Sequence, residues 1–340
     1  MSLILIASGG TGGHMFPARA FAEALIASGC EVALVTDPRG QRYAADFPAR
    51  RQLILPVANA DEGGLGGRIR AVVGHARSLL AASAFMRAER PALVVGFGGY
   101  PSFPALAAAG GTPILIHEQN AVLGRVNRLF QGRAAAVASG FARLARLHAS
   151  AVAKHVVVGN PVRAPIVAAR ETVFCPPAGD GPLNILVTGG SQGARVLGEA
   201  VPAAIAALPE ALRLSLHVTH QVREQQLTAA RESYDAAGVK ADIAPFFQDM
   251  ADLLAKSHLV IGRSGASTVS EVAVVGRPSI LVPLAIATND HQTENARALA
   301  DVGAADVIPE AALTVPGLTA LLERRLSDRA DLMARAEAAR

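Results

Sequence analysis

The stretch LILIASGGTGGH, residues 3–14, decides the fold of this 340-residue chain. Its apolar first half is typical of a buried parallel strand, and its glycine-rich second half opens a helical stretch. The same construction returns at residues 184–194, where NILV is followed by TGGSQGA. Two such turns predict two mononucleotide-type domains, and the length of the chain suits two domains.

The glycine-rich turns are candidate ligand sites. Backbone N–H groups at the start of a helix lie at its positive end, where a phosphate or a close substrate is held. Glycine is needed there because a side chain would block the approach or the positive φ. For either turn alone, a tight turn without a ligand is the alternative interpretation.

The composition indicates an α/β protein. With 51% hydrophobic, 18% charged and 4% aromatic residues, the chain is unlike low-complexity disorder. The longest uncharged run, residues 92–116, contains three prolines, so it predicts strand, loop, helix and strand rather than a membrane span.

No positive charge precedes the first apolar residues, so we expect no secretory signal. Cys30 and Cys175 form no metal or redox spacing, which favours a reduced cytosolic protein.

Charge is distributed unevenly between the two halves. Residues 1–158 hold 16 Lys and Arg against 8 Asp and Glu, a net +8, whereas residues 159–340 hold 16 against 20, a net −4. The first half therefore predicts an anionic partner. Scarce aromatics and the lack of a recognition module argue against nucleic acid, and favour an anionic membrane surface or a pyrophosphate-bearing substrate. Ordinary solvated surface is the alternative, because Arg outnumbers Lys 29 to 3 throughout.

Residues 1–158 alternate apolar strands with helical stretches, which predicts a mostly parallel sheet with helices on both faces. We expect strands at residues 3–7, 31–36, 53–56, 92–97, 113–117, 135–138 and 155–158. A ligand crevice then lies beyond the carboxyl ends of the strands, where the loops 10–14, 96–102 and 117–120 collect.

Residues 68–89 are predicted to form an amphipathic helix with interleaved arginines. Its apolar residues are Ile69, Val72, Val73, Leu79, Leu80 and Met86. Such a helix either lies on a membrane interface or turns this stripe toward the sheet.

The second half begins after GNPVRAP, residues 159–165, whose two prolines and missing periodicity predict an extended interdomain connection. The first domain is thus expected at 1–158 and the second at 166–340. Strands of the second domain are expected at residues 184–187, 214–218, 242–244, 259–261, 280–282 and 305–308.

The densest polar segment of the chain is GRSGASTVSE, residues 262–271, directly after an apolar strand. Small residues and hydroxyls at a helix start are suited to phosphate. Glu271, one turn beyond Ser267, is suited to accept hydrogen bonds from a ribose, with an exposed helix glutamate as the alternative. Residues 289–295, NDHQTEN, offer amides and carboxylates to sugar hydroxyls, or serve only as a helix cap.

Six motifs in order resemble one family. They are GGTGGH with the following FPA (9–18), HEQN (117–120), GNPVR (159–163), GGSQGAR (189–195), RSGA to SE (263–271) and DHQT (290–293). Together they resemble the MurG family of N-acetylglucosaminyltransferases. These enzymes convert undecaprenyl-pyrophosphoryl-MurNAc-pentapeptide (lipid I) into lipid II in peptidoglycan synthesis. The resemblance runs from residue 4 to about residue 308.

The resemblance implies a GT-B fold, in which two Rossmann-like domains with mostly parallel sheets face across a cleft. The C-terminal domain would hold UDP-GlcNAc. The N-terminal domain would receive lipid I at the cytoplasmic face of the bacterial inner membrane, as a peripheral protein. Other cell-wall synthesis proteins are further candidate partners. Packing of the last helix, residues 333–340, back on the N-terminal domain is an arrangement that the sequence leaves open. No cofactor is implied.

The family's site residues carry over position by position. Thr11, Gly12, Gly13 and Asn120 would line the cleft near the transferred sugar, and Arg163 and Ser191 would approach the donor diphosphate or sugar. Ala266, Ser267 and Thr268 would lie at the α-phosphate, Glu271 at the ribose, Phe247 at the uracil through its backbone, and Gln292 at GlcNAc hydroxyls. Met15 and Phe247 depart from the residues usual in the family, which leaves the uracil contact open.

His14 is the candidate general base. Inverting glycosyl transfer needs a base for the acceptor hydroxyl and positive electrostatics for the departing UDP. An imidazole accepts a proton near neutral pH. The alternative is a histidine that only orders the turn or binds acceptor phosphate. No Asp-x-Asp pair occurs, so no metal is expected at the diphosphate, and the helix start at 266 with Arg163 would supply the charge.

Three other functions are consistent with parts of the pattern. A UDP-GlcNAc epimerase would share the nucleotide site without needing a basic first domain. A nicotinamide dehydrogenase would have a third glycine where Met15 stands. A lipid-carrier binding module would explain the positive charge of the first half, but it would give no role to the residues suited to a sugar nucleotide.

Overall fold

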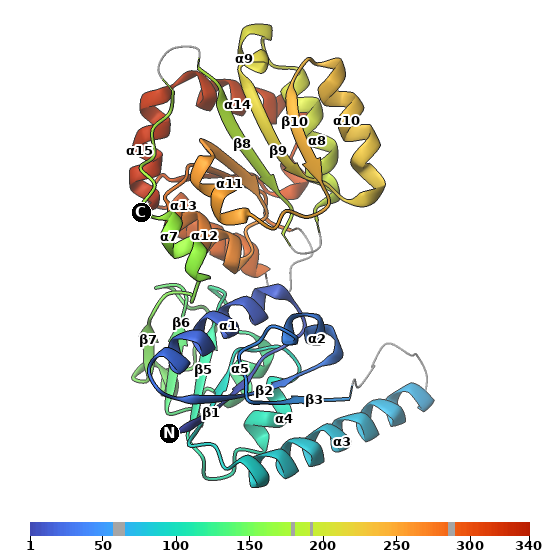
Figure 1. The fold of residues 1–340 in the computed structure, drawn as a ribbon, viewed down its shortest axis with the longest axis vertical. Helices are drawn as coiled ribbons and strands as arrows, with labels where there is room; N and C mark the ends of the chain where they lie inside the picture. The colour runs from blue at the N-terminus through green and yellow to red at the C-terminus, as the bar shows by residue number, and fades with distance from the viewer. Residues whose placement is uncertain (57–64, 178–180, 191–192, 285–289) are drawn as a thin grey trace. The chain divides into compact units, whose positions relative to one another are not determined.

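The computed structural model describes residues 1–56, 65–177, 181–190, 193–284 and 290–340. The chain forms two compact units, Met1–Arg163 and Ala164–Arg340, each with its own sheet (Figure 1).

Unit 1 is a seven-stranded sheet in the order β3-β2-β1-β4-β5-β6-β7, with every neighbouring pair parallel. The strands are β1 (Leu3–Ala7), β2 (Glu31–Thr36), β3 (Arg51–Ile54), β4 (Leu93–Gly96), β5 (Ile114–Glu118), β6 (Ala136–Ser139) and β7 (His155–Val157). The helices are α1 (Gly12–Ala27), α2 (Pro38–Ala44), α3 (Leu65–Glu89), α4 (Ser102–Ala107), α5 (Arg125–Phe130) and α6 (Ala149–Val152).

Alternation along β1 explains the two cores of unit 1. Leu3 and Leu5 pack on the face covered by α3 and α4, whereas Ile4 and Ile6 pack on the face covered by α1. This inner strand is apolar on both faces because helices cover both. This confirms the predicted parallel sheet with helices on its two sides.

Unit 2 repeats the design with six parallel strands in the order β10-β9-β8-β11-β12-β13. They are β8 (Leu183–Thr188), β9 (Leu216–Gln221), β10 (Lys240–Ala244), β11 (Leu259–Gly262), β12 (Ser279–Leu281) and β13 (Ala305–Val307). The helices are α7 (Ala164–Ala169), α8 (Arg195–Ala206), α9 (Glu210–Leu214), η1 (Glu224–Gln226), α10 (Leu227–Ala236), α11 (Met250–Lys256), α12 (Ala266–Val275), α13 (His291–Ala300), η3 (Glu310–Ala312), α14 (Val315–Ser327) and α15 (Arg329–Ala339).

The strand order reverses once in each unit, between β1 and β4 and between β8 and β11. Loops after such neighbouring strands diverge to opposite faces and leave a crevice, where open α/β sheets bind their ligands. The two glycine-rich turns found in the sequence follow β1 and β8, so each lies at a switch point.

The connection between the two units is shorter than the sequence predicts. Ala164 and Pro165, expected in the extended connection, begin α7, because proline fits the first turn of a helix. The last helix, α15, packs within unit 2 against α14 and α12. Its packing on the first domain stays a prediction.

Candidate active site at the switch points

The glycine turn after β1 is held in place by a carboxylate. Asp37, which follows β2 as the N-cap of α2 and is only 1% exposed, accepts hydrogen bonds from the backbone N–H of Gly10 at 3.2 Å and of Gly40 at 2.8 Å. Its other oxygen faces the Arg39 guanidinium at 2.9 Å. Gly10 itself has φ +87°, a conformation that favours glycine. Sequence analysis missed Asp37, although an acidic residue directly after the second strand is a recognisable signal.

A second glycine turn, after β4, packs directly on the first. Gly98 and Gly99 both have positive φ, and a Cβ on Gly99 would come within 2.9 Å of the Gly9 carbonyl oxygen. A Cβ on Gly98 would come within 3.3 Å of His14 Cε1. The imidazole of His14 therefore lies over the second turn while its backbone belongs to α1, so the two turns fix its position together.

His14 is joined to the HEQN segment by hydrogen bonds. Its Nδ1 lies 2.8 Å from Gln119 Oε1, and Gln119 Nε2 lies 3.0 Å from His117 Nδ1. His117 Nε2 lies 3.1 Å from the Gly159 carbonyl oxygen. Burial lowers the pKa of His117, although the bond to Gly159 and the charge of Glu118 oppose this shift. His117 is therefore neutral at neutral pH.

Asn120 is placed by the buried carboxylate of Glu118, which is 2% exposed. One oxygen of Glu118 accepts from the Asn120 backbone N–H at 3.1 Å and side-chain amide at 3.2 Å. The other accepts from Gly124 N–H at 2.8 Å and the Asn127 amide at 2.9 Å. Glu118 thus shapes the loop after β5 from inside. It is a structural residue of the site that the motif contained but sequence analysis did not single out.

Arg163 ends unit 1 beside the start of α1. Its guanidinium lies over the Phe16 ring, 5.1 Å from the centroid, and Phe16 meets Tyr43 edge-on at 5.3 Å. A Cβ on Gly12 would come within 2.8 Å of the Phe16 ring, so this aromatic pair borders the glycine turn. Unit 1 therefore brings Thr11, Gly12, Gly13, His14, Asn120 and Arg163 to one end of its sheet.

The turn after β8 is braced by two polar side chains. Thr188 Oγ1 donates to Gln221 Oε1 at 2.9 Å, and the Gly190 N–H donates to Thr188 Oγ1 at 3.3 Å. Gln221 Nε2 reaches the carbonyl oxygens of Gly190 at 3.1 Å and Pro245 at 3.3 Å. Gln221 thus ties this turn to the loop that carries Phe247, which is half-buried. Ser191 lies outside the described residues.

The start of α12, directly after β11, has no side-chain cap. Its N-cap, Gly265, brings no side chain to the first-turn N–H groups, so these donors remain available to an anion. The Ser267 hydroxyl, in the first turn, has no hydrogen-bond partner among the described residues. Ala266, Thr268 and Glu271 follow on the same short helix. The residues assigned to the α-phosphate and ribose are therefore together, at the second switch point.

Buried bonds hold the loops around α12. Arg263 donates to the carbonyl oxygens of Val282 at 3.1 Å and Pro283 at 3.2 Å, and pairs with Glu310 at 2.8 Å. Gln292 Oε1 accepts from the Leu284 N–H at 2.9 Å, so this amide supports the loop after β12. Sequence analysis quoted Arg263 in a motif without giving it this role.

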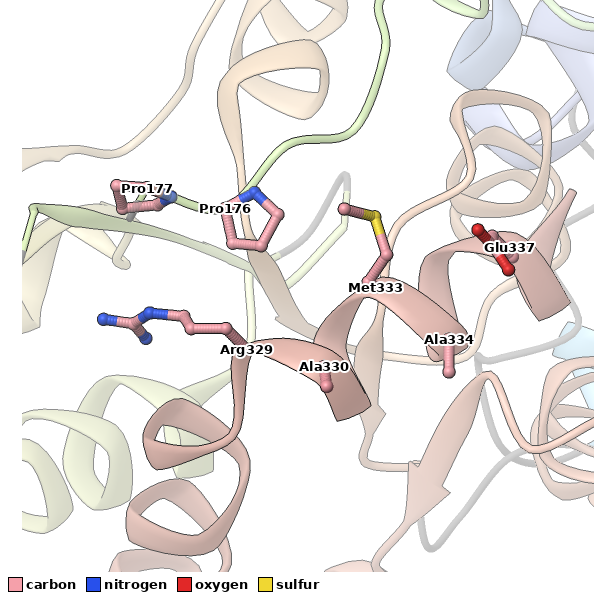
Figure 2. Close-up of a pocket in the computed structure, with 7 residues that line it drawn as sticks. All are labelled: Pro176, Pro177, Arg329, Ala330, Met333, Ala334 and Glu337. Carbon is pink, nitrogen blue, oxygen red and sulfur yellow. The ribbon is translucent and has the colours of Figure 1, made fainter. Parts of the chain in front are cut away.

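A separate cavity of about 610 Å³ lies along α15 (Figure 2). Pro176 and Pro177 line one side, and Arg329, Ala330, Met333, Ala334 and Glu337 of α15 line the other. None of the residues predicted for catalysis or substrate binding lines it. Among the described residues, no three His, Cys, Asp or Glu side chains gather as a metal site.

Comparison with known proteins points to one family. The N-terminal domain model of glycosyltransferase family 28 matches residues 4–139, and the C-terminal domain model matches residues 184–340. In Maricaulis maris (strain MCS10), the UDP-N-acetylglucosamine–N-acetylmuramyl-(pentapeptide) pyrophosphoryl-undecaprenol N-acetylglucosamine transferase is 54% identical over 338 residues, which are 99% of this chain and 92% of the relative.

Solved structures agree with this family. The crystal structure of Acinetobacter baumannii MurG matches with a TM-score of 0.80 and 33% identity, over 100% of this chain and 95% of that one. A UDP-N-acetylglucosamine 2-epimerase structure has a TM-score of 0.63 at 14% identity, over 99% of this chain and 90% of that one. At that identity the epimerase shares the fold alone.

Proposed function

Since the chain belongs to glycosyltransferase family 28, with both of its domains present in order, we propose that it transfers GlcNAc from UDP-GlcNAc to undecaprenyl-pyrophosphoryl-MurNAc-pentapeptide. The products are lipid II and UDP, and the accepting group is the MurNAc 4-hydroxyl. The observation that carries this function is 54% identity over nearly the whole chain to a transferase of that name. The fold is GT-B, and the enzyme is an N-acetylglucosaminyltransferase.

The reaction inverts the anomeric centre in one displacement. The acceptor oxygen forms a bond to C1 of GlcNAc as the bond from C1 to the UDP oxygen breaks, and UDP departs with the electron pair. The acceptor proton passes to His14, which lies in the first turn of α1 and over the second glycine turn. No redox partner is needed for this step.

Unit 2 is proposed to hold the donor. The open N–H groups at the start of α12 bind the α-phosphate and stabilise the charge that develops on UDP. The unpartnered Ser267 hydroxyl supports this assignment, because a phosphate oxygen would accept its proton. In this scheme Glu271 takes the ribose, the Phe247 backbone the uracil and Gln292 the GlcNAc hydroxyls. Arg163 and Ser191 remain predicted contacts to the diphosphate or sugar.

Unit 1 is proposed to receive the lipid acceptor at an anionic membrane surface, on the cytoplasmic face. Helix α3 buries Ala82 and Met86 but leaves Val72 and Leu80 each 69% exposed, beside the exposed Arg77. Apolar side chains with arginines at their border are suited to an interface of anionic lipids. Among the described residues, no helix has the length and hydropathy needed to span a bilayer. Contacts with other cell-wall synthesis proteins remain a prediction.

The test is incubation of the full chain with UDP-GlcNAc and a soluble lipid I analogue, followed by mass spectrometry of the products. We expect a disaccharide product and UDP in equal amounts, and neither without the acceptor. Formation of a GlcNAc epimer in the absence of acceptor, with no disaccharide in its presence, would instead identify an epimerase and refute the proposal.

A further inference from the structure

Gln119 lies between two histidines, and its amide has only one orientation that satisfies its neighbours. The side chain is 1% exposed. Its Nε2 lies 3.0 Å from the backbone carbonyl oxygen of His117. A carbonyl oxygen only accepts hydrogen bonds, so the amide nitrogen, not the amide oxygen, must face it. The second N–H of the same nitrogen points to His117 Nδ1, also at 3.0 Å.

His117 supports the same orientation from the other side. Its Nε2 faces the Gly159 carbonyl oxygen at 3.1 Å and therefore carries the proton of the neutral ring. Its Nδ1 is left with a lone pair, which accepts from Gln119. The backbone of Gln119 is held as well, because Asn160 Nδ2 donates to its carbonyl oxygen at 2.9 Å. The orientation of the Gln119 amide is thus fixed by groups that belong to three different segments.

With the nitrogen committed to His117, Gln119 Oε1 faces His14 Nδ1 at 2.8 Å. An amide oxygen has no proton to give, so His14 Nδ1 must be the donor. A neutral imidazole carries one N–H, and its other nitrogen then holds a lone pair. The contacts therefore select the Nδ1–H tautomer of His14 and leave Nε2 as the basic atom.

We propose that Gln119 is a positioning residue that keeps neutral His14 in its Nδ1–H tautomer, with Nε2 free to take the acceptor proton. This inference rests on the proposed function, in which His14 is the base. After proton transfer His14 carries N–H on both nitrogens, and Gln119 Oε1 still accepts from Nδ1–H. The same contact therefore orients the base before the transfer and stabilises the imidazolium after it.

The direct test is nitrogen-15 NMR of the full chain with labelled histidine, with the His14 signals assigned by their loss in His14→Ala. At neutral pH we expect wild-type His14 Nδ1 to show the chemical shift of a protonated ring nitrogen and Nε2 that of an unprotonated one. In Gln119→Met, which keeps the length but lacks both polar atoms, we expect a mixture of tautomers. A wild-type His14 protonated on Nε2 would overturn the proposal, whatever the activity of the enzyme.

Steady-state kinetics test whether the contact between Gln119 and His14 affects catalysis. We expect Gln119→Met to lower kcat about 10- to 100-fold, as is typical when a supporting hydrogen bond is lost, with acceptor KM and donor affinity nearly unchanged. Gln225→Met, an exposed glutamine in η1, should match the wild type. Adding Gln119→Met to His14→Ala should cause no further loss, because the glutamine acts through the histidine. Independent, multiplying losses would overturn the proposal, as would an unchanged kcat in Gln119→Met.

The proposed function and the role of Gln119 can be refuted separately. If the wild type makes no disaccharide but His14 is protonated on Nδ1, the proposed function fails and the tautomer assignment stands. If the wild type is active and Gln119→Met has wild-type kcat, only the role of Gln119 fails. Circular dichroism and thermal unfolding of Gln119→Met show whether a lower kcat results from lost structure. The double variant with His14→Ala shows whether Gln119 acts through His14, in a background whose kcat is already low.

Discussion

At the scale of single residues, the buried charged groups of both units mostly bond to loop backbone rather than to a ligand site. Asp37 accepts from backbone N–H groups of the turn after β1 and of α2, Glu118 accepts from two N–H groups of the loop after β5, and Arg263 donates to two consecutive carbonyl oxygens. Such bonds fix the conformation of loops that come from different strands. Few groups of the site therefore remain for catalysis or ligand binding. His14 and the start of α12 are the clearest candidates.

Substitution of His14 by alanine tests the base. We expect UDP-GlcNAc affinity to stay nearly intact, because the donor is assigned to unit 2, and kcat with the lipid I analogue to fall about 100- to 10,000-fold. Steady-state kinetics with both substrates varied over pH 5.5 to 8.5 provides the measurement. A variant with wild-type kcat and the same acidic limb would exclude His14 as the base. A raised acceptor KM with little loss of kcat would indicate acceptor binding instead.

Substitution of Glu271 by alanine tests the ribose contact. Loss of hydrogen bonds from two hydroxyls to a carboxylate should weaken UDP-GlcNAc binding by about 1 to 3 kcal/mol. Titration calorimetry measures this, with Glu323→Ala as a matched control because that glutamate is exposed on α14. Equal donor affinity in the Glu271 variant and the control would remove Glu271 from the nucleotide site.

Some residues of the site can be recognised from the sequence, and others cannot. Glycines of tight turns and a histidine after them stand out because their type and position are unusual. Gln119, Gln221 and Arg263 do not, because each contacts a group far away in the sequence, His14 for Gln119, Gly190 for Gln221 and Val282 for Arg263, and no spacing reveals such contacts. The sequence places Ser267 at a helix start, but only the structure shows that its hydroxyl has no partner within the described part of the chain.

At the scale of elements, strands were easier to predict than the environment of helices. A strand buried on both faces shows as a short apolar run, and each expected run corresponds to a strand whose ends are shifted by at most three residues. Helix α3 shows the difficulty. Its apolar spacing allowed either a membrane face or a core face, yet only Met86 of the predicted stripe is buried among the described side chains. Periodicity cannot tell which apolar stripe meets the sheet.

The exposed stripe of α3 leads to a vesicle-binding prediction. The chain should bind anionic vesicles and release them as salt rises, because attraction of arginines to lipid is screened within about 8 Å at physiological ionic strength. Val72→Asp with Leu80→Asp should reduce binding at least severalfold. Val173→Asp, at an equally exposed valine of unit 2, should not. Sedimentation with neutral and anionic vesicles checks this, and equal binding to both at low salt would contradict it.

At the scale of the whole molecule, buried histidines make stability depend on pH. Burial lowers the pKa of His220 to about 3, and burial also lowers the pKa values of His117 and His258. Below the unfolded pKa of 6.5 the unfolded chain binds protons that the folded chain does not, so stability is full above pH 6.5 and falls as pH falls. His220 alone should remove about 1.4 kcal/mol per pH unit on the acidic side.

Urea unfolding at pH 7, 6, 5 and 4 measures this dependence. The matched variant is His220→Phe with Tyr234→Phe, because the Tyr234 hydroxyl lies 3.0 Å from His220 Nδ1 and would otherwise lose its partner. The free energy of unfolding of this variant should fall less steeply between pH 6 and 4 than that of the wild type. Parallel curves would show that His220 does not titrate on unfolding.

The buried carboxylate of Asp37 bears on whether unit 1 can bind a nucleotide cofactor. In dinucleotide-binding domains an acidic residue about 20 residues beyond the glycine turn accepts the ribose hydroxyls of the cofactor. Here both oxygens of that carboxylate already accept hydrogen bonds within unit 1, from Gly10 of the glycine turn and from Arg39 and Gly40 of α2, so we expect unit 1 to lack this ribose contact. An engineer who wished to turn unit 1 into a cofactor-binding module would first have to release Asp37, and would then lose a bond that supports the glycine turn directly before His14.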